Sequence, residues 1–192
     1  MEAAQAFETV FQTNSRYIHQ SPIVQLFPLH LLQINSLIIS GMDQEILVLG
    51  IGNILLGDEG IGVHTVRHLE AKPYPGNISF LDGGTGGFHL LSVFQQYKKI
   101  ILVDATLDGR PPGKVSMLKP KYAKDFPQTL SAHDIGLRDL VNSSALLGFL
   151  PEIYLITVSI SENQPLSMEL SEEVGQSVAE IELLVNELIG KI

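Results

Sequence analysis

The stretch EILVLGIGNILLGDEGIG, residues 45–62, carries the pattern from which the fold follows. A short apolar run leads into a glycine-rich turn, and the acids Asp58 and Glu59 precede a second apolar segment. An apolar run that ends in glycines and is followed by an amphipathic segment is typical of a buried strand that turns into a helix. We therefore expect a strand at Glu45–Gly50 and a helix at Gly60–Glu70.

The same alternation of apolar runs and amphipathic segments continues to the end of the chain. It is typical of βαβ units, and strands that are apolar along their whole length are typical of a parallel sheet covered on both faces. The sequence predicts an α/β fold: a single three-layer domain in which a mostly parallel, twisted sheet is flanked by helices. The other predicted strands are Ile78–Asp82, Ile100–Asp104 and Ile153–Ser159, with an extra edge strand at Gly113–Leu118. The other predicted helices are Phe88–Tyr97, Ile135–Leu147 and Ser171–Ile189. An irregular loop is expected at Lys119–Ser131.

Residues 1–41 precede this pattern, and Met42 comes shortly before the first predicted strand. They lack the basic start of a signal peptide and an uninterrupted apolar run of the roughly 20 residues that a bilayer crossing needs. We predict that residues 1–41 are a dispensable N-terminal extension, that residues 42–192 form the domain, and that Met42 is an alternative start. A docking arm is the other interpretation of the extension. We expect a cytoplasmic protein without a membrane anchor.

The composition excludes several classes of function. Hydrophobic residues make up 45% of the 192 residues, which is enough for a packed core. The 12 Lys and Arg residues against 21 Asp and Glu give a formal charge of −9, which disfavours nucleic acid and anionic membranes as partners. The chain has no cysteine, so disulfides, thiolate metal sites and a cysteine nucleophile are excluded. Any metal would be bound by His, Asp and Glu.

Acidic side chains recur where the predicted strands end. Glu59 follows the first strand, Asp82 closes the second and Asp104 closes the third. The C-terminal ends of parallel strands form one edge of a sheet, where ligands bind. Because clustered carboxylates repel one another, they favour a bound cation. With His133 as a nitrogen donor, Glu59, Asp104 and His133 form a mixed set suited to Ni, Zn or Co.

Each of these residues also has a structural interpretation. Asp58 or Glu59 can stabilise the start of the first helix, because acids are favourable in a first turn. Asp82 precedes glycines and can form a turn, and His133 can lie at the surface or cap a helix.

Two histidines, His64 and His68, stand four residues apart on the first predicted helix. This spacing is able to bind a metal, but Thr65 replaces the glutamate of the zinc-protease pattern HExxH. We therefore expect a partly exposed polar face.

Two glycine-rich segments resemble general motifs. The first lacks the third glycine of a dinucleotide fingerprint, having Leu55 in its place, and acids follow where a pyrophosphate would lie, so we expect no organic cofactor. The second, residues 83–87, has the shape of a GxSxG elbow with Thr85 in place of serine, and Thr85, Asp104 and His133 follow the chain order of an α/β-hydrolase triad. A Thr85-based hydrolase therefore remains an alternative.

Four segments of the chain form a combined pattern: GIGNILLGDEGIG at 50–62, DGGTGG at 82–87, LVDA at 102–105 and SAHD at 131–134. This pattern resembles that of the hydrogenase maturation proteases, and the resemblance covers the chain from Met42 to its end. It implies that the residues predicted above to bind metal also act in catalysis, namely Glu59, Asp104 and His133. It further implies that a substrate groove is shaped by Asp82, Gly83, Gly84 and Thr85.

The resemblance also implies a function. Proteases of this family cut a C-terminal peptide from the large-subunit precursor of [NiFe] hydrogenases after nickel has been inserted. The implied partner is that precursor, and the implied metal is nickel carried by the precursor. An aspartyl type of protease is expected, and a metal-polarised carbonyl and a metal-activated water both remain open as routes of hydrolysis. A non-catalytic nickel carrier is the second alternative. Substrate choice is expected to lie in Lys119–Leu130 and Glu162–Ser167.

Overall fold

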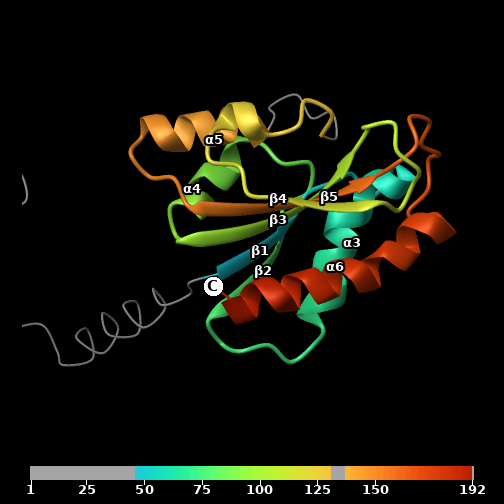
Figure 1. Ribbon diagram of the computed structural model, residues 1–192, viewed down its shortest axis with the longest axis horizontal. Coiled ribbons are helices and arrows are strands. Elements are labelled where there is room, and N and C mark those ends of the chain that lie inside the picture. Colours follow the sequence, from blue (N-terminus) through green and yellow to red (C-terminus); the bar gives the residue numbers. More distant parts are fainter. Residues whose placement is uncertain (1–45, 131–136, 192) are drawn as a thin grey trace, which may run out of the picture. The chain divides into compact units, whose positions relative to one another are not determined.

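A computed structural model describes residues 46–130 and 137–191 (Figure 1). At their centre lies a five-stranded sheet of strand order β2-β1-β3-β5-β4. Strand β4 is antiparallel to β5, and the other neighbouring strands are parallel. The predicted mostly parallel sheet is therefore confirmed. Its strands are β1 (Ile46–Gly50), β2 (Ile78–Asp82), β3 (Lys99–Thr106), β4 (Val115–Leu118) and β5 (Glu152–Ser159).

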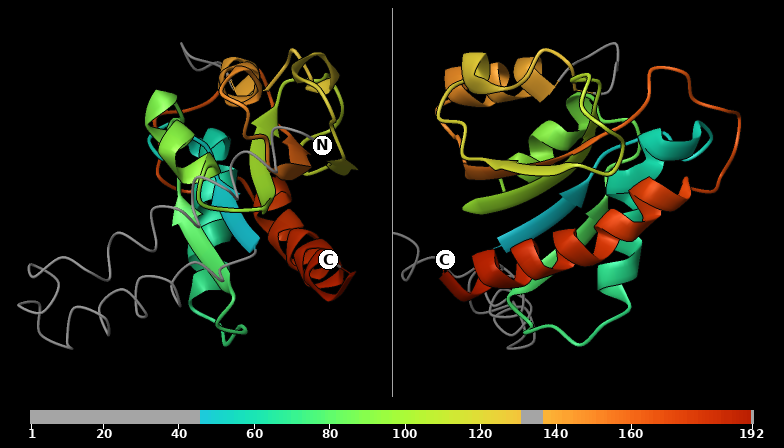
Figure 2. Two further views of the ribbon diagram at one scale, coloured as in Figure 1. Left: turned by 90° about the vertical axis from the view of Figure 1, so that its left-hand side faces the viewer. Right: turned by 45° about the vertical axis from the view of Figure 1, so that its right-hand side comes forward.

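Helices cover both faces of the sheet, as Figures 1 and 2 show. Helices α3 (Ile61–Glu70) and α6 (Glu172–Lys191) lie on one face, and α4 (Leu91–Phe94) and α5 (Leu137–Leu146) lie on the other. The predicted three-layer α/β arrangement is confirmed. Three short 3₁₀ turns complete the described elements: η3 (Gly57–Gly60), η4 (Phe88–Leu90) and η5 (Ala123–Asp125).

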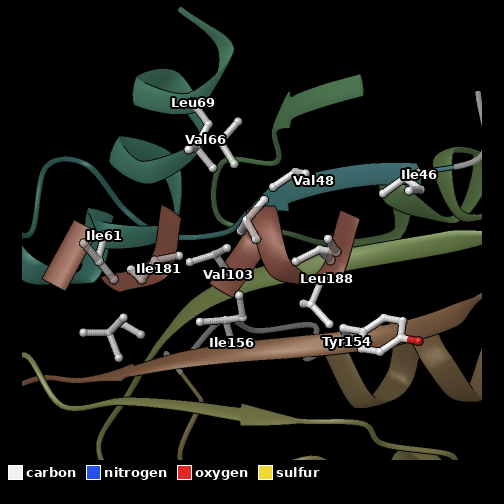
Figure 3. Packing of buried hydrophobic residues seen from close by; sticks show 14 of the residues in the cluster. Ile46, Val48, Ile61, Val66, Leu69, Val103, Tyr154, Ile156, Ile181 and Leu188 are labelled. Atoms are coloured by element: carbon white, nitrogen blue, oxygen red, sulfur yellow. The ribbon is translucent and has the colours of Figure 1, made fainter. Parts of the chain in front are cut away.

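One apolar core lies between the sheet and helices α3 and α6 (Figure 3). Val48, Val103 and Ile156, from the three central strands, belong to one buried cluster with Val66 of α3 and Ile181 of α6. Each such side chain stabilises the fold by about 1.5–3 kcal/mol relative to its exposed state. Burial of this face therefore fixes both helices on the sheet.

A second core covers the opposite face. Alternate residues of the same strands, Leu49, Leu102 and Leu155, share a buried cluster with Phe94 of α4 and Leu140 of α5. Because successive side chains of a strand point to opposite faces, the central strands are apolar throughout. Strand β2 differs from this expectation: it lies at the edge of the sheet, and its last four residues are only partly buried or exposed.

The structure differs from the predicted elements in several places. Strand β3 continues two residues past Asp104, because β5 offers partners as far as Ser159, which pairs with Thr106. The helix predicted at 88–97 is reduced to η4 and the short α4, since β3 begins soon afterwards. The segment predicted to be an irregular loop contains η5.

Some predictions fall outside the described residues. The extension 1–41, His133 and the start of the helix predicted at 135–147 belong to these. Within the two described ranges, no helix has the length and apolar character needed to cross a bilayer.

Candidate active site

The turn after β1 is packed against the start of α3 by glycines. A Cβ added to Gly50 would lie 2.1 Å from the carbonyl oxygen of Gly62, and one added to Gly62 would lie 2.2 Å from that of Val103. Gly52 has a φ of 154°, and its Cβ would lie 2.0 Å from the carbonyl oxygen of Glu59. Only glycine permits such close backbone approach. The glycines therefore hold the backbone of Glu59 against the turn after β1, close to β3.

Asp104 is buried in β3, with 2% of its surface exposed. It follows Val103, whose carbonyl oxygen accepts a hydrogen bond from the N–H of Ile51 at 2.9 Å. Its own Oδ1 accepts a hydrogen bond from the N–H of Ala105 at 2.8 Å. A buried carboxylate is costly unless hydrogen bonds or a positive charge compensate it. Because Val103 is hydrogen-bonded to Ile51, Asp104 lies inside the carboxyl edge of the sheet, next to the turn that the glycines hold.

The structure brings two of the three predicted metal ligands to one edge. Half-buried Glu59 and buried Asp104 come from segments that contact each other through Gly62 and Val103. The third, His133, is outside the described residues. In the part of the chain that is described, no three His, Asp or Glu side chains are grouped to hold a metal. Carboxylates combined with an imidazole suit a borderline ion such as nickel.

The neighbour of Glu59, Asp58, has a structural role that the sequence did not reveal. Its carboxylate is buried and accepts hydrogen bonds from the backbone N–H of Ser171 at 2.7 Å and from the Ser171 hydroxyl at 3.0 Å. Its backbone N–H donates to Oε1 of Gln164 at 2.9 Å. No side chain caps η3 or α3, so Asp58 does not cap the first helix. Instead it anchors η3 to the residue that precedes α6.

The sequence around Ser171 predicts the helix start but not the pairing of Ser171 with Asp58. Serine followed by two glutamates is typical of a helix start, and the Ser171 hydroxyl accepts a hydrogen bond from the N–H of Val174 at 3.4 Å. Its pairing with Asp58 spans 113 positions along the chain, a distance at which no local pattern operates.

Asp82 ends β2 and supports the glycine loop that follows. Its Oδ1 accepts a hydrogen bond from the N–H of Gly84 at 2.9 Å, and its Oδ2 accepts one from Nη2 of Arg67 at 2.8 Å. The N–H of Gly83 donates to the carbonyl oxygen of Gly50 at 2.8 Å, so the loops after β1 and β2 run side by side. The turn-forming interpretation of Asp82 is confirmed, and the substrate groove remains a prediction.

Thr85 is exposed in this loop. No described acid or histidine is seen to hydrogen-bond to its hydroxyl, and His133, which a Thr85 hydrolase would need as its base, lies outside the described ranges. No described residue other than glycine has a positive φ, so Thr85 does not have the strained backbone of a nucleophile elbow.

The two histidines of α3 lie in different surroundings. His68 is exposed and pairs with Glu182 of α6, which also accepts hydrogen bonds from Lys72. The Lys72 ammonium lowers the pKa of Glu182, with a smaller effect of His68. His64 is half-buried, and its Nε2 is buried without a hydrogen-bond partner among the described atoms. Burial and then Arg67 lower the pKa of His64. Both histidines are therefore at least partly exposed, as expected, although the Nε2 atom of His64 is buried.

Comparison with known proteins identifies relatives. A family model described as hydrogenase maturation protease matches residues 63–188. The hydrogenase expression/formation protein HupD of Bradyrhizobium diazoefficiens is 35% identical over 133 residues, which cover 68% of this chain and 67% of that one. The hydrogenase 2 maturation protease of Escherichia coli K12 is 36% identical over 122 residues, covering 62% and 74%. For HupD of Rhodobacter capsulatus the chain spans about half the relative's length, 53%.

Solved structures give the same result. The hydrogenase maturating endopeptidase HybD from E. coli superimposes with a TM-score of 0.68 at 32% identity, covering 77% of this chain and 93% of that one. The [NiFe] hydrogenase maturation protease HybD from Thermococcus kodakarensis gives 0.62 at 29% identity, covering 75% and 98%. These matches agree in fold and in sequence, and they confirm the resemblance predicted from the motifs. The chain belongs to the hydrogenase maturation protease family.

Proposed function

We propose that this chain is the endopeptidase that removes the C-terminal peptide from the nickel-loaded large-subunit precursor of a [NiFe] hydrogenase, and that it acts in the cytoplasm. Membership of the family supports a peptidase that acts on hydrogenase. The observation that carries the proposal is the glycine-packed junction, which holds Glu59 at the carboxyl edge of the sheet beside the segment of Asp104.

In this proposal Glu59, Asp104 and His133 bind the nickel that the precursor carries, so the metal is part of the substrate. Carboxylates that share one ion repel each other when the ion is absent. A nickel ion removes this repulsion, whereas a nickel-free precursor does not. Nickel binding would also place the adjoining peptide bond next to the catalytic groups, which is a large part of the rate gain in such reactions. Processing therefore follows metal insertion.

Hydrolysis of the peptide bond needs a group that accepts a proton from the attacking water. Glu59 is half-buried and keeps contact with solvent, whereas Asp104 is enclosed. This difference favours Glu59 as the proton acceptor, which then returns the proton to the leaving amine. An aspartyl type of protease would instead use Asp104 in that role.

The substitution Glu59→Gln tests the site, because it keeps the size of the side chain and removes its charge. We expect the rate of precursor cleavage to fall by at least about 100-fold, in line with the loss of a general base. The measurement is the loss of C-terminal mass from purified, nickel-loaded precursor. Glu70→Gln, an exposed acid at the end of α3, is the matched control and should cleave at the wild-type rate. Wild-type cleavage by Glu59→Gln would refute the assignment.

The same assay separates the enzyme from a nickel carrier. A carrier that uses the same three residues would bind the nickel-loaded precursor and leave its mass unchanged.

A further inference from the structure

Two segments that are distant in sequence pair beside Glu59. The carbonyl oxygen of Leu55 accepts a hydrogen bond from the N–H of Ser167 at 3.2 Å, and the N–H of Gly57 donates to the carbonyl oxygen of Ser167 at 2.8 Å. Leu56 and Ser167 thereby form a parallel bridge. Figures 1 and 2 show the segment that precedes α6 beside η3. We call residues 53–57 and 164–168 the ledge.

The ledge exposes large apolar side chains. Leu55 is 58% exposed, Leu166 is 88% exposed and Met168 is 58% exposed. Leu55 and Leu166 each directly precede a residue of the bridge, and Met168 follows one, so the three residues lie close together on the two paired segments. Exposed apolar side chains collected from two separate segments are typical of a binding surface.

The ledge is also held firmly next to Glu59. Gln164, within the ledge, accepts a hydrogen bond from the N–H of Asp58, and the Asp58 carboxylate binds Ser171 just beyond the ledge. These contacts join the ledge, η3 and the start of α6 into one unit. A surface that is already ordered loses little conformational entropy when a partner binds.

We propose that the ledge is the docking surface for the hydrogenase large-subunit precursor, which covers Leu55, Leu166 and Met168 with an apolar surface of its own. The proposal rests on the proposed function. The occupant follows from continuity with the candidate site: Leu55 lies four residues before Glu59 on the same turn. A protein that covers the ledge is therefore placed to deliver its nickel and its C-terminal segment to the carboxyl edge of the sheet.

A second group of exposed apolar residues serves as a reference. Leu146 is the last residue of α5, and Leu147 begins the turn that leads to β5. This turn lies at the amino edge of the parallel strands, opposite to Glu59. Leu146 is 88% exposed, the same fraction as Leu166. It therefore provides a control that matches Leu166 in residue type and exposure but not in location.

The experiment compares Leu166→Ser, Met168→Ser and Leu146→Ser with the wild type, after circular dichroism has established that each is folded. Binding of purified nickel-loaded precursor is measured by calorimetry, and its cleavage is followed by mass. We expect each ledge substitution to raise both Kd and KM for the precursor about tenfold, because an apolar anchor at an interface is lost. The rate at saturating precursor should change much less. Leu146→Ser should leave Kd and KM at their wild-type values.

The outcomes distinguish this proposal from the proposed function. If the wild type does not cleave but Leu166→Ser weakens precursor binding, the docking surface stands and the protease activity does not. If the wild type cleaves and Leu166→Ser has wild-type Kd and KM, the docking surface is refuted. If Leu166→Ser converts a dimer into monomers in sedimentation without changing precursor affinity, the occupant is a second copy of this chain and the proposal is again refuted.

Discussion

At the scale of single residues, Asp58 and Glu59 are adjacent in sequence but differ in burial and in hydrogen bonding. Asp58 is 6% exposed and its carboxylate is bound by Ser171, whereas Glu59 is half-buried at the edge of the sheet. Charge-assisted hydrogen bonds of this kind are about twice as strong as neutral ones. Asp58 therefore positions the turn that carries Glu59, and it is not free to bind a metal.

Replacing Asp58 should destabilise the protein. Asp58→Ala leaves the N–H and the hydroxyl of Ser171 without their acceptors, so we expect the free energy of unfolding to fall by about 2–3 kcal/mol. Asp58→Asn keeps one acceptor oxygen and should lose less. Urea denaturation measures both. The exposed Asp139, in the first turn of α5, offers the control Asp139→Asn, which should lose no more than about 1 kcal/mol. An equal, small effect of Asp58→Ala and Asp139→Asn would show that the anchor contributes nothing.

His64 should make stability depend on pH. Burial, and to a lesser extent Arg67, lower its pKa below the ordinary value of 6.5, while a hydrogen bond with the backbone of Met168 acts in the opposite direction. The unfolded chain therefore binds this proton at a higher pH than the folded chain. Its contribution to stability is complete above about pH 6.5 and is lost as the pH falls toward the lowered pKa.

We expect the free energy of unfolding to decrease between about pH 7.5 and pH 5.5, and to decrease less in His64→Gln, which cannot be protonated. Urea denaturation at the two pH values is the measurement. Because the remaining titratable groups are shared, the difference between the two proteins isolates His64. Identical pH slopes would contradict the assignment.

At the scale of elements, the contact of α3 with the strands β1 and β3 depends on glycine. A methyl group at Gly62 would meet two backbone oxygens, 2.2 Å from that of Val103 and 2.3 Å from that of Ile51. Backbone atoms cannot rotate away as a side chain can, so the helix would have to move. The turn that carries Glu59 would move with it.

Two alanine substitutions test this contact. Gly62→Ala should destabilise the protein by about 1–3 kcal/mol or more, as overpacking does. Gly175→Ala, in α6, is the matched control, because a Cβ there meets no atom within 4 Å. Alanine favours a helix more than glycine does, so Gly175→Ala should stabilise the protein by up to about 1 kcal/mol. Thermal and urea unfolding measure both. Equal effects of the two substitutions would contradict the packing argument.

The elements differ in how well the sequence predicts them. The central strands were predictable because their apolar runs are continuous, and the long α6 because its apolar residues fall on one stripe. The end of β3 was not, since it depends on pairing with residues of β5 that lie more than 50 positions later. The exposed side of β2 depends on its place at the sheet edge, which no local pattern specifies.

The candidate site was predictable to a similar degree. Topology alone brings Glu59 and Asp104 to one edge, because parallel strands share the direction of their carboxyl ends. The anchor between Asp58 and Ser171 and the pairing of Asp82 with Arg67 depend on contacts between side chains that only the folded chain brings together.

At the scale of the whole molecule, the proposed function combines an acidic chain, a carboxylate pair and a metal that arrives with the substrate. A formal charge of −9 gives a positively charged ion a favourable approach. The ledge supplies a neighbouring apolar surface, and the glycine junction holds the backbone of Glu59 close to β3. Recognition of the precursor should therefore require the protein surface and the nickel together.

The mass of the large-subunit precursor after incubation with this protein shows whether the protein cleaves it and whether cleavage requires nickel. One sample of precursor is loaded with nickel and the other is kept free of it, and both are treated with the same amount of the full chain. We expect the nickel-loaded precursor to lose a C-terminal peptide and the nickel-free precursor to keep its full mass. Equal cleavage of both samples, or cleavage of neither, would contradict this expectation.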